Sequence, residues 1–128
     1  MNNQVPQSLR VWFWAHFIVD MLFGIPLLFV PAATLSLFGL PAANLLFARL
    51  VGAALLGIGG ASLSMRQAGS ETYRAILELK VIWSLSAIFA ISLSLFQGAP
   101  KIVWGFLAIF ILFSTVWIYY RFFRLSQN

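Results

Sequence analysis

Four apolar stretches, each about long enough to cross a lipid bilayer, constrain this chain more than any other feature. They cover residues 11–30, 45–64, 77–96 and 102–120, and segments containing proline, glycine or polar residues separate them. A bilayer-spanning helix needs about 20 predominantly apolar residues. The pattern therefore predicts an all-α integral membrane protein, a four-transmembrane-helix bundle built from a single transmembrane domain of residues 1–128.

The composition supports this class. Hydrophobic residues make up 62% of the chain and charged residues 9%, whereas a soluble domain is roughly half apolar and a quarter charged. Four spans use most of the 128 residues. Any chemistry must therefore take place inside the bilayer or at its faces.

Basic residues concentrate on one side of the predicted membrane. With four spans, both termini and the second loop share a side. That side carries Arg10, Arg66, Arg74, Lys80, Arg121 and Arg124, and the other carries Lys101. The positive-inside rule then predicts a multi-pass protein with its N- and C-termini in the cytoplasm. Orientation and anionic lipid explain the net charge of +5, so we expect the lipid bilayer as a partner and no nucleic acid.

Several kinds of chemistry are excluded or disfavoured by residue type. The chain has no cysteine, which removes disulfides, thiol redox chemistry and thiolate metal sites. It has one histidine, and a metal site needs three or four nitrogen or oxygen ligands. No nucleophile elbow, phosphate-binding loop or zinc-protease motif is present. We therefore expect neither a metal nor a cofactor.

Three prolines indicate where the predicted spans begin or bend. Pro41 and Pro100 stand where the first turns of the second and fourth spans would begin, a position at which proline costs no hydrogen bond. Pro26 lies inside the first span and predicts a kink. Residues 31–41 are apolar but too short to cross, which predicts a short interfacial or re-entrant helix on the outer side.

The first span contains two polar residues in the stretch FWAHFIVDMLFG. His16 and Asp20 lie one turn apart on one helix face, so the imidazole can hydrogen-bond to the carboxylate. A charge near the bilayer centre costs about 2.5–3.5 kcal/mol on insertion scales. Asp20 should therefore face the interior, paired or protonated. The alternative is that both residues only hold helices together.

Arg49 shares a face of the second span with mostly small residues, namely Gly52, Ala53, Leu56, Gly57, Gly60 and Ser64. Such a face lets helices approach closely, so we expect Arg49 to point into the bundle. The alternative is that its side chain extends to the outer surface.

In the third span Glu78 lies on the same face as Arg74, Ile82, Leu85 and Phe89, whereas Lys80 lies about 200° away. We expect Glu78 inside and Lys80 facing lipid. The predicted interior cluster is His16, Asp20, Arg49 and Glu78. Trp83 lies deeper than the interfacial aromatic residues and is a candidate ligand contact.

An apolar cavity with this cluster predicts an accessory-type membrane protein rather than an enzyme. It would bind a lipophilic ligand such as a quinone or lipid, a membrane-protein partner or a second copy of itself. Two alternatives stay open: a proton-coupled small-molecule transporter, and a cofactor-independent lipid isomerase or cyclase with His16, Asp20 and Glu78 as catalytic candidates.

The stretches PAATLSLFGLP and ARLVGAALLGIGG contain a turn at Phe38, Gly39, Leu40 and Pro41, followed by Arg49, Gly52, Gly57 and Gly59. In these residues, in length and in helix number the chain resembles the DoxX-like group of small four-helix membrane proteins. The resemblance implies a bacterial or archaeal inner-membrane protein, with relatives linked to quinol oxidation or acting as accessory factors. It carries over no catalytic residue.

Overall fold

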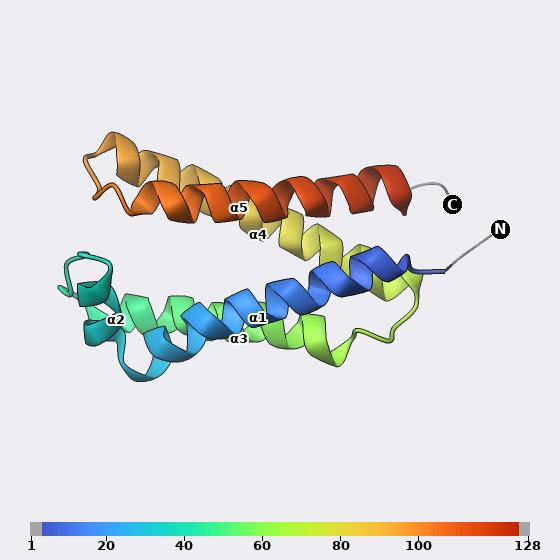
Figure 1. Ribbon diagram of the computed structural model, residues 1–128, viewed down its shortest axis with the longest axis horizontal. Helices are drawn as coiled ribbons and strands as arrows, with labels where there is room; N and C mark the ends of the chain where they lie inside the picture. The colour runs from blue at the N-terminus through green and yellow to red at the C-terminus, as the bar shows by residue number, and fades with distance from the viewer. Residues whose placement is uncertain (1–3, 126–128) are drawn as a thin grey trace. The chain divides into compact units, whose positions relative to one another are not determined.

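A computed structural model describes residues 4–125, and every regular element in this range is helical (Figure 1). The three residues at each end of the predicted domain, 1–3 and 126–128, lie outside the described residues. The all-α class is confirmed. The elements are α1 (Gln7–Phe29), α2 (Pro31–Leu37), α3 (Leu45–Ser64), α4 (Ser70–Phe96), α5 (Val103–Ile118) and the π-helix η1 (Tyr119–Arg124).

Four of the described helical segments are long and apolar enough to cross a membrane: α1, α3, α4 and α5 continued by η1. This confirms the four predicted spans and indicates a multi-pass membrane protein. The second span has the predicted bounds of Leu45 and Ser64. The third begins at Ser70 rather than at residue 77, because a helix can continue beyond the apolar stretch that marks a span.

Helix starts differ from the proline-based expectation. Pro41 lies in the loop before α3, and Asn44 caps this helix instead, its side chain accepting a hydrogen bond from the Leu46 N–H at 3.0 Å. The Asn44 amide oxygen thus pairs with a backbone N–H in the first turn of α3. A proline has no side-chain oxygen that could do this. Pro31 occupies the first turn of α2. Pro100 precedes α5 by a short turn, and its carbonyl accepts a hydrogen bond from Val103 N at 3.0 Å.

Two glycines end helices in the left-handed region of backbone space. Gly39 follows α2 with φ of +67°, and Gly98 follows α4 with φ of +91°. After α2, Leu40 N donates to Leu35 O at 2.8 Å and Gly39 N donates to Ser36 O at 3.0 Å, which is the Schellman pattern. The predicted short helix of residues 31–41 thus exists as α2 and ends at a turn that glycine favours.

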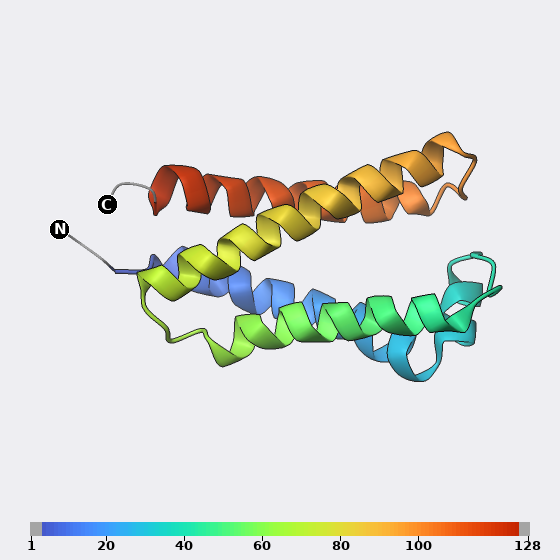
Figure 2. The same ribbon diagram turned by 180° about the vertical axis from the view of Figure 1, so that it is seen from behind.

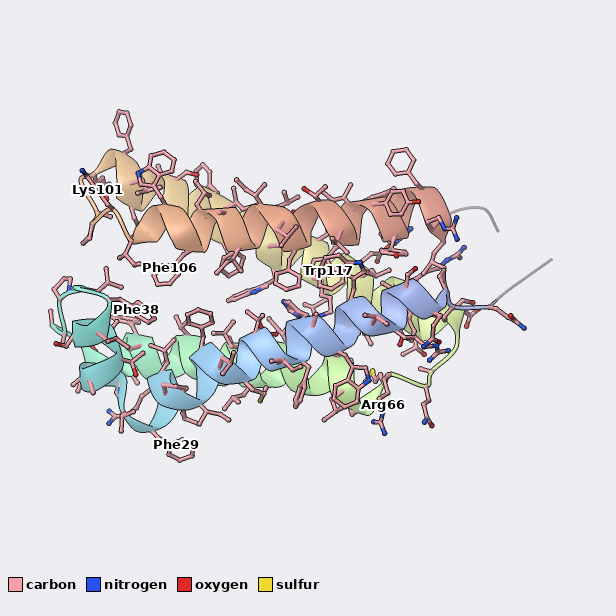
Figure 3. All side chains as sticks on the ribbon, viewed as in Figure 1. Phe29, Phe38, Arg66, Lys101, Phe106 and Trp117 are labelled. Atoms are coloured by element: carbon pink, nitrogen blue, oxygen red, sulfur yellow. The ribbon has the colours of Figure 1, made fainter. Side chains whose placement is uncertain are left out.

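The chain divides into two compact units. The N-terminal unit, Gln7–Gln67, contains α1, α2 and α3, and the C-terminal unit contains α4, α5 and η1. In the N-terminal unit α1 and α3 run antiparallel and α2 lies at one end (Figure 1). Phe38 and Arg66 mark the opposite ends of this unit (Figure 3).

Glycines set the close approach of α1 to α3. A Cβ on Gly52 would lie 2.8 Å from the Gly24 carbonyl oxygen and 2.8 Å from Leu28 N. The small-residue packing expected of a membrane helix is therefore present. The face is rotated, however: the buried residues of α3 are Gly52, Leu55, Gly59 and Ser62. Two glycines of the predicted face, Gly57 and Gly60, have open space beside them, because a Cβ added at either would meet nothing within 4 Å.

The C-terminal unit is an antiparallel pair of α4 and α5, joined by a tight turn (Figure 2). Lys101 lies at this turn, away from Trp117 (Figure 3). Beyond Ile118 the helix widens into η1, and Leu125 N donates to Tyr120 O at 2.9 Å. Tyr119 stacks on Phe123 with ring centroids 6.3 Å apart, so aromatic contacts support this last turn.

Candidate functional site

The site begins with the His16–Asp20 pair on α1. His16 Nδ1 lies 3.1 Å from Asp20 Oδ2, and both side chains are buried, with exposures of 6% and 4%. Helical spacing of four residues places the two groups on one face. The sequence-based prediction that these residues pair and face inward is confirmed.

Gly59 on α3 provides the space for Asp20. A Cβ at position 59 would lie 2.7 Å from Asp20 Cβ and 3.0 Å from Asp20 Oδ2. Contacts this short are not tolerated between real side chains, so the carboxylate rests directly against the backbone of α3. Sequence reasoning did not assign Gly59 to this face. The signal that would have found it is the alternative helical register of Gly52, Leu55, Gly59 and Ser62, in which three of the four residues are small.

Ser62 extends the polar part of this face. It is 1% exposed and its hydroxyl donates to Ile58 O at 3.1 Å. Because α1 and α3 run antiparallel and Asp20 meets Gly59, one turn back along α1 to His16 corresponds to one turn forward along α3 to Ser62. The N-terminal unit therefore holds a buried imidazole, carboxylate and hydroxyl in adjoining turns.

Arg49 does not join this group. It is exposed and precedes Gly59 by ten residues of α3, about 15 Å of helix axis. The prediction that Arg49 points inward is therefore wrong. The outward alternative fits the structure, because the buried face of α3 begins at Gly52 and is rotated away from Arg49.

The assignments of Glu78 and Lys80 are also wrong, and they are reversed. The Glu78 side chain is 55% exposed and accepts hydrogen bonds from Nε of Arg121, at 3.1 Å, and from its Nη2. Lys80 is fully buried, and its Nζ lies 4.9 Å from the centroid of the Trp117 ring. The buried residues of α4 are Tyr73, Ile76, Leu77, Lys80, Val81 and Ser84.

The reason for the reversal is that α4 is apolar on nearly every side. Ile82, Leu85 and Phe89, which share the predicted inner face with Glu78, have exposures of 65%, 48% and 67%. Lipid tails accept such side chains as readily as a protein core does. Hydrophobic periodicity therefore does not distinguish the buried face from the lipid-facing one.

Trp83 lies in the C-terminal unit. Its ring is half-buried and lies 6.4 Å from Phe110 between centroids. Its indole Nε1 is buried without a hydrogen-bond partner among the described residues. A buried indole N–H usually has an acceptor, so Trp83 remains a candidate ligand contact.

Among residues 4–125, no three His, Cys, Asp or Glu side chains come together in a group that could hold a metal ion. His16 and Asp20 are buried titratable groups of the N-terminal unit. They can accept, donate or share a proton, or contact the polar part of a bound molecule.

Comparisons of the chain with protein-family models, with curated proteins and with solved structures found no match.

Proposed function

We propose that this chain is a small multi-pass protein of the bacterial inner membrane that acts as an accessory or binding subunit. In this proposal the His16–Asp20 pair contacts the polar part of a lipophilic ligand, such as a quinone or lipid, or of a membrane partner. The observation that supports it most is a buried imidazole and carboxylate 3.1 Å apart within a helix apolar enough to span the bilayer.

The packing of α1 against α3 does not by itself require the His16–Asp20 pair. The closest backbone approach of α1 to α3 uses Gly24 and Gly52, which carry no polar side chain. An ionisable residue within a membrane span costs about 2.5–3.5 kcal/mol on insertion scales, and such residues usually mark substrate, ion or proton sites. This favours a role for Asp20 beyond joining the two helices.

The binding proposal is tested with Asp20→Asn. Asparagine keeps the shape of the side chain against Gly59 but replaces the ionisable carboxyl group with an amide. We expect the variant to fold and to lose the lipophilic ligand or partner that native mass spectrometry detects on the purified wild-type protein. Glu71→Gln is the matched control, because Glu71 is an exposed carboxylate in the first turn of α4. Wild-type protein that carries neither ligand nor partner would contradict the proposal.

Proton-coupled transport is a second candidate, favoured by the same short distance between two groups that can exchange a proton. It predicts that Asp20→Asn abolishes substrate uptake driven by a pH gradient in proteoliposomes while leaving the helical content intact. Uptake by this variant at the wild-type rate would exclude transport through Asp20.

A lipid isomerase has less support, because the third group expected to act in it, Glu78, is exposed and paired with Arg121. The proposed orientation, with both termini cytoplasmic, gains support within the N-terminal unit. An Nη1 hydrogen bond from Arg10 to the Arg66 carbonyl places these two basic residues at one end of the α1–α3 pair, and a cytoplasmic surface attracts such clusters.

A further inference from the structure

Three charged side chains lie at one end of the C-terminal unit, where α4 begins and η1 follows α5 (Figure 2). Arg121 of η1 donates hydrogen bonds to Glu78 of α4 through Nε, at 3.1 Å, and through Nη2. Arg74 precedes Glu78 by four residues and so lies on the same face of α4. Side chains of a helix lean toward its N-terminus, so Glu78 leans toward Arg74. We call Arg74, Glu78 and Arg121 the charged cluster.

The charged cluster lies where the apolar part of both spans ends. On α4, Arg74 precedes the apolar stretch of residues 77–96 by about one turn. On η1, Arg121 directly follows the apolar stretch of residues 102–120. Lipid headgroups lie just outside the hydrocarbon core of a bilayer. The two guanidinium groups are therefore at the depth of the lipid phosphates.

Arg74 has a hydrogen-bond donor that no described protein group accepts. Its Nε is buried and has no hydrogen-bond partner among residues 4–125. The carboxylate of Glu78 pairs with Arg121 instead, and Glu71, three residues before Arg74, makes no ion pair within the described range. Unpaired buried polar groups are rare in folded proteins and call for a partner. Arginine only donates hydrogen bonds, so a partner from outside the chain must be an acceptor.

Charge and access favour an anion as this acceptor. Four basic residues stand at this end of the unit against two carboxylates: Arg74, Lys80, Arg121 and Arg124 against Glu71 and Glu78. Glu78 uses Nε and Nη2 of Arg121, which leaves Nη1 for another acceptor. The side chains of Arg121 and Glu78 are 20% and 55% exposed, so a ligand reaches them from the surface without entering a cavity. Planar guanidinium donors match the oxygens of a phosphate.

The conformation of η1 presents Arg121 to α4. Leu125 N donates to Tyr120 O at 2.9 Å, the five-residue hydrogen bond of a π-helix. Tyr120 and Leu125 are both buried, so the wider turn keeps them on the inner side while Arg121 reaches Glu78. Turns of π-helix are rare and frequently occur at functional sites. The last helix thus departs from regular α geometry at the charged cluster.

An exposed apolar row continues from the charged cluster along the same face of α4. It consists of Ile82, Leu85 and Phe89, which follow Glu78 at helical spacings of three and four residues. Their exposures are 65%, 48% and 67%. From Glu78 to Phe89 the helix axis rises about 16 Å, close to half of a hydrocarbon core of roughly 30 Å. The row therefore has the length of one lipid leaflet.

We propose that Arg74 and Arg121 bind the phosphate of an anionic phospholipid whose acyl chains lie along the exposed apolar row. The excess of positive charge at this end repels the cationic group of a zwitterionic headgroup. An anionic headgroup without such a cation is therefore preferred. The proposal stands apart from the function proposed above, because no step uses the His16–Asp20 pair.

Native mass spectrometry of the full-length protein in detergent tests this preference. The protein is titrated with dioleoyl phosphatidylglycerol and, separately, with dioleoyl phosphatidylcholine, which has the same acyl chains and a neutral headgroup. We expect a Kd about fivefold lower for phosphatidylglycerol, as for a charge interaction at an accessible site. Equal Kd values for the two lipids would overturn the proposal.

Inorganic phosphate distinguishes a lipid site from a site for a free anion. Excess inorganic phosphate should leave phosphatidylglycerol bound, because it has no acyl chains to contact the exposed apolar row. Displacement of the lipid by inorganic phosphate would show that the charged cluster takes a free anion, and would overturn the choice of a lipid.

Substitutions locate the site. Arg74→Gln should raise the Kd for phosphatidylglycerol about fivefold, and Arg121→Gln about tenfold because it also leaves Glu78 without its cation. Arg49→Gln is the matched control, since Arg49 is an exposed arginine of α3, and its Kd should equal the wild-type value. Wild-type affinity in Arg74→Gln, or an equal loss in Arg49→Gln, would show that binding does not use the charged cluster.

Circular dichroism checks that each variant folds. If Arg121→Gln does not fold, Arg121→Lys takes its place. Lysine keeps the charge but not the planar set of donors, so this variant should still bind the lipid more weakly than the wild type. Asp20→Asn should bind phosphatidylglycerol with the wild-type Kd, so failure here is distinguishable from failure of the function proposed above.

Discussion

Gly59 lets the carboxylate of Asp20 lie against the backbone of α3, where a Cβ would be 2.7 Å from Asp20 Cβ. The same helix contains Gly57, whose added Cβ would meet nothing within 4 Å. Two glycines separated by one residue therefore have different roles: Gly59 makes room for a polar side chain of α1, and Gly57 does not.

Gly59→Ala should lower the free energy of unfolding by about 1–3 kcal/mol, as overpacking of a close contact does. Gly57→Ala should be neutral or slightly stabilising, because alanine favours the helix more than glycine does. Denaturant unfolding of the purified protein in detergent measures both. Equal stability of the two variants would show that Asp20 does not pack against Gly59.

The ion pair of Glu78 with Arg121 is exposed enough for water to screen it. Glu78→Gln should therefore change the free energy of unfolding by less than about 1 kcal/mol. The same unfolding experiment checks this value. A loss of several kcal/mol would restore the interpretation of Glu78 as an interior group.

At the scale of elements, the helix ends are defined locally by side chains and backbone geometry. Asn44 caps the start of α3, and glycines with positive φ follow α2 and α4. The sequence marks such positions only by residue type, and the start of α3 lies at Asn44 rather than at the predicted Pro41. The faces that these helices bury are not marked in the same way.

Replacement of Gly98 by alanine should cost about 1–2 kcal/mol, since a Cβ in the left-handed region clashes with the following carbonyl group. Gly105→Ala in α5 is the control, because its added Cβ would meet nothing within 4 Å and its φ is not positive. Thermal unfolding followed by circular dichroism should separate the two variants. If both melt together, the turn after α4 is not constrained by Gly98.

For the whole molecule, four span-forming helices and the distribution of basic residues lead to one proposed orientation. Each unit also contains its own buried titratable groups, His16 and Asp20 in the N-terminal unit and Lys80 in the C-terminal unit. Charged residues make up only 9% of the chain, yet two of them, Asp20 and Lys80, are buried. Burying such a residue within a membrane is costly.

The orientation predicts the behaviour of reporter fusions. Alkaline phosphatase inserted beside Lys101 should be active, because this enzyme functions only outside the cytoplasm. Green fluorescent protein fused to the C-terminus should fluoresce, because that end should be cytoplasmic. The opposite pair of results would reverse the orientation, and mixed signals from both positions would indicate dual topology.

Local features of the sequence were sufficient for the helical class, the four spans and the His16–Asp20 pair. Span length follows from consecutive apolar residues, and pairing at a spacing of four follows from helix geometry. Neither span length nor this pairing depends on which other helix packs against the span.

Only the tertiary structure decided which faces are buried. Arg49 and Glu78 are exposed, whereas Lys80 is buried beside Trp117. Gly59, rather than Gly57, lies against α1. In a soluble protein, water would have distinguished these faces by their polarity. In lipid the interior and the surroundings are both apolar, so the choice of face rests on close contacts between helices that are distant in the sequence.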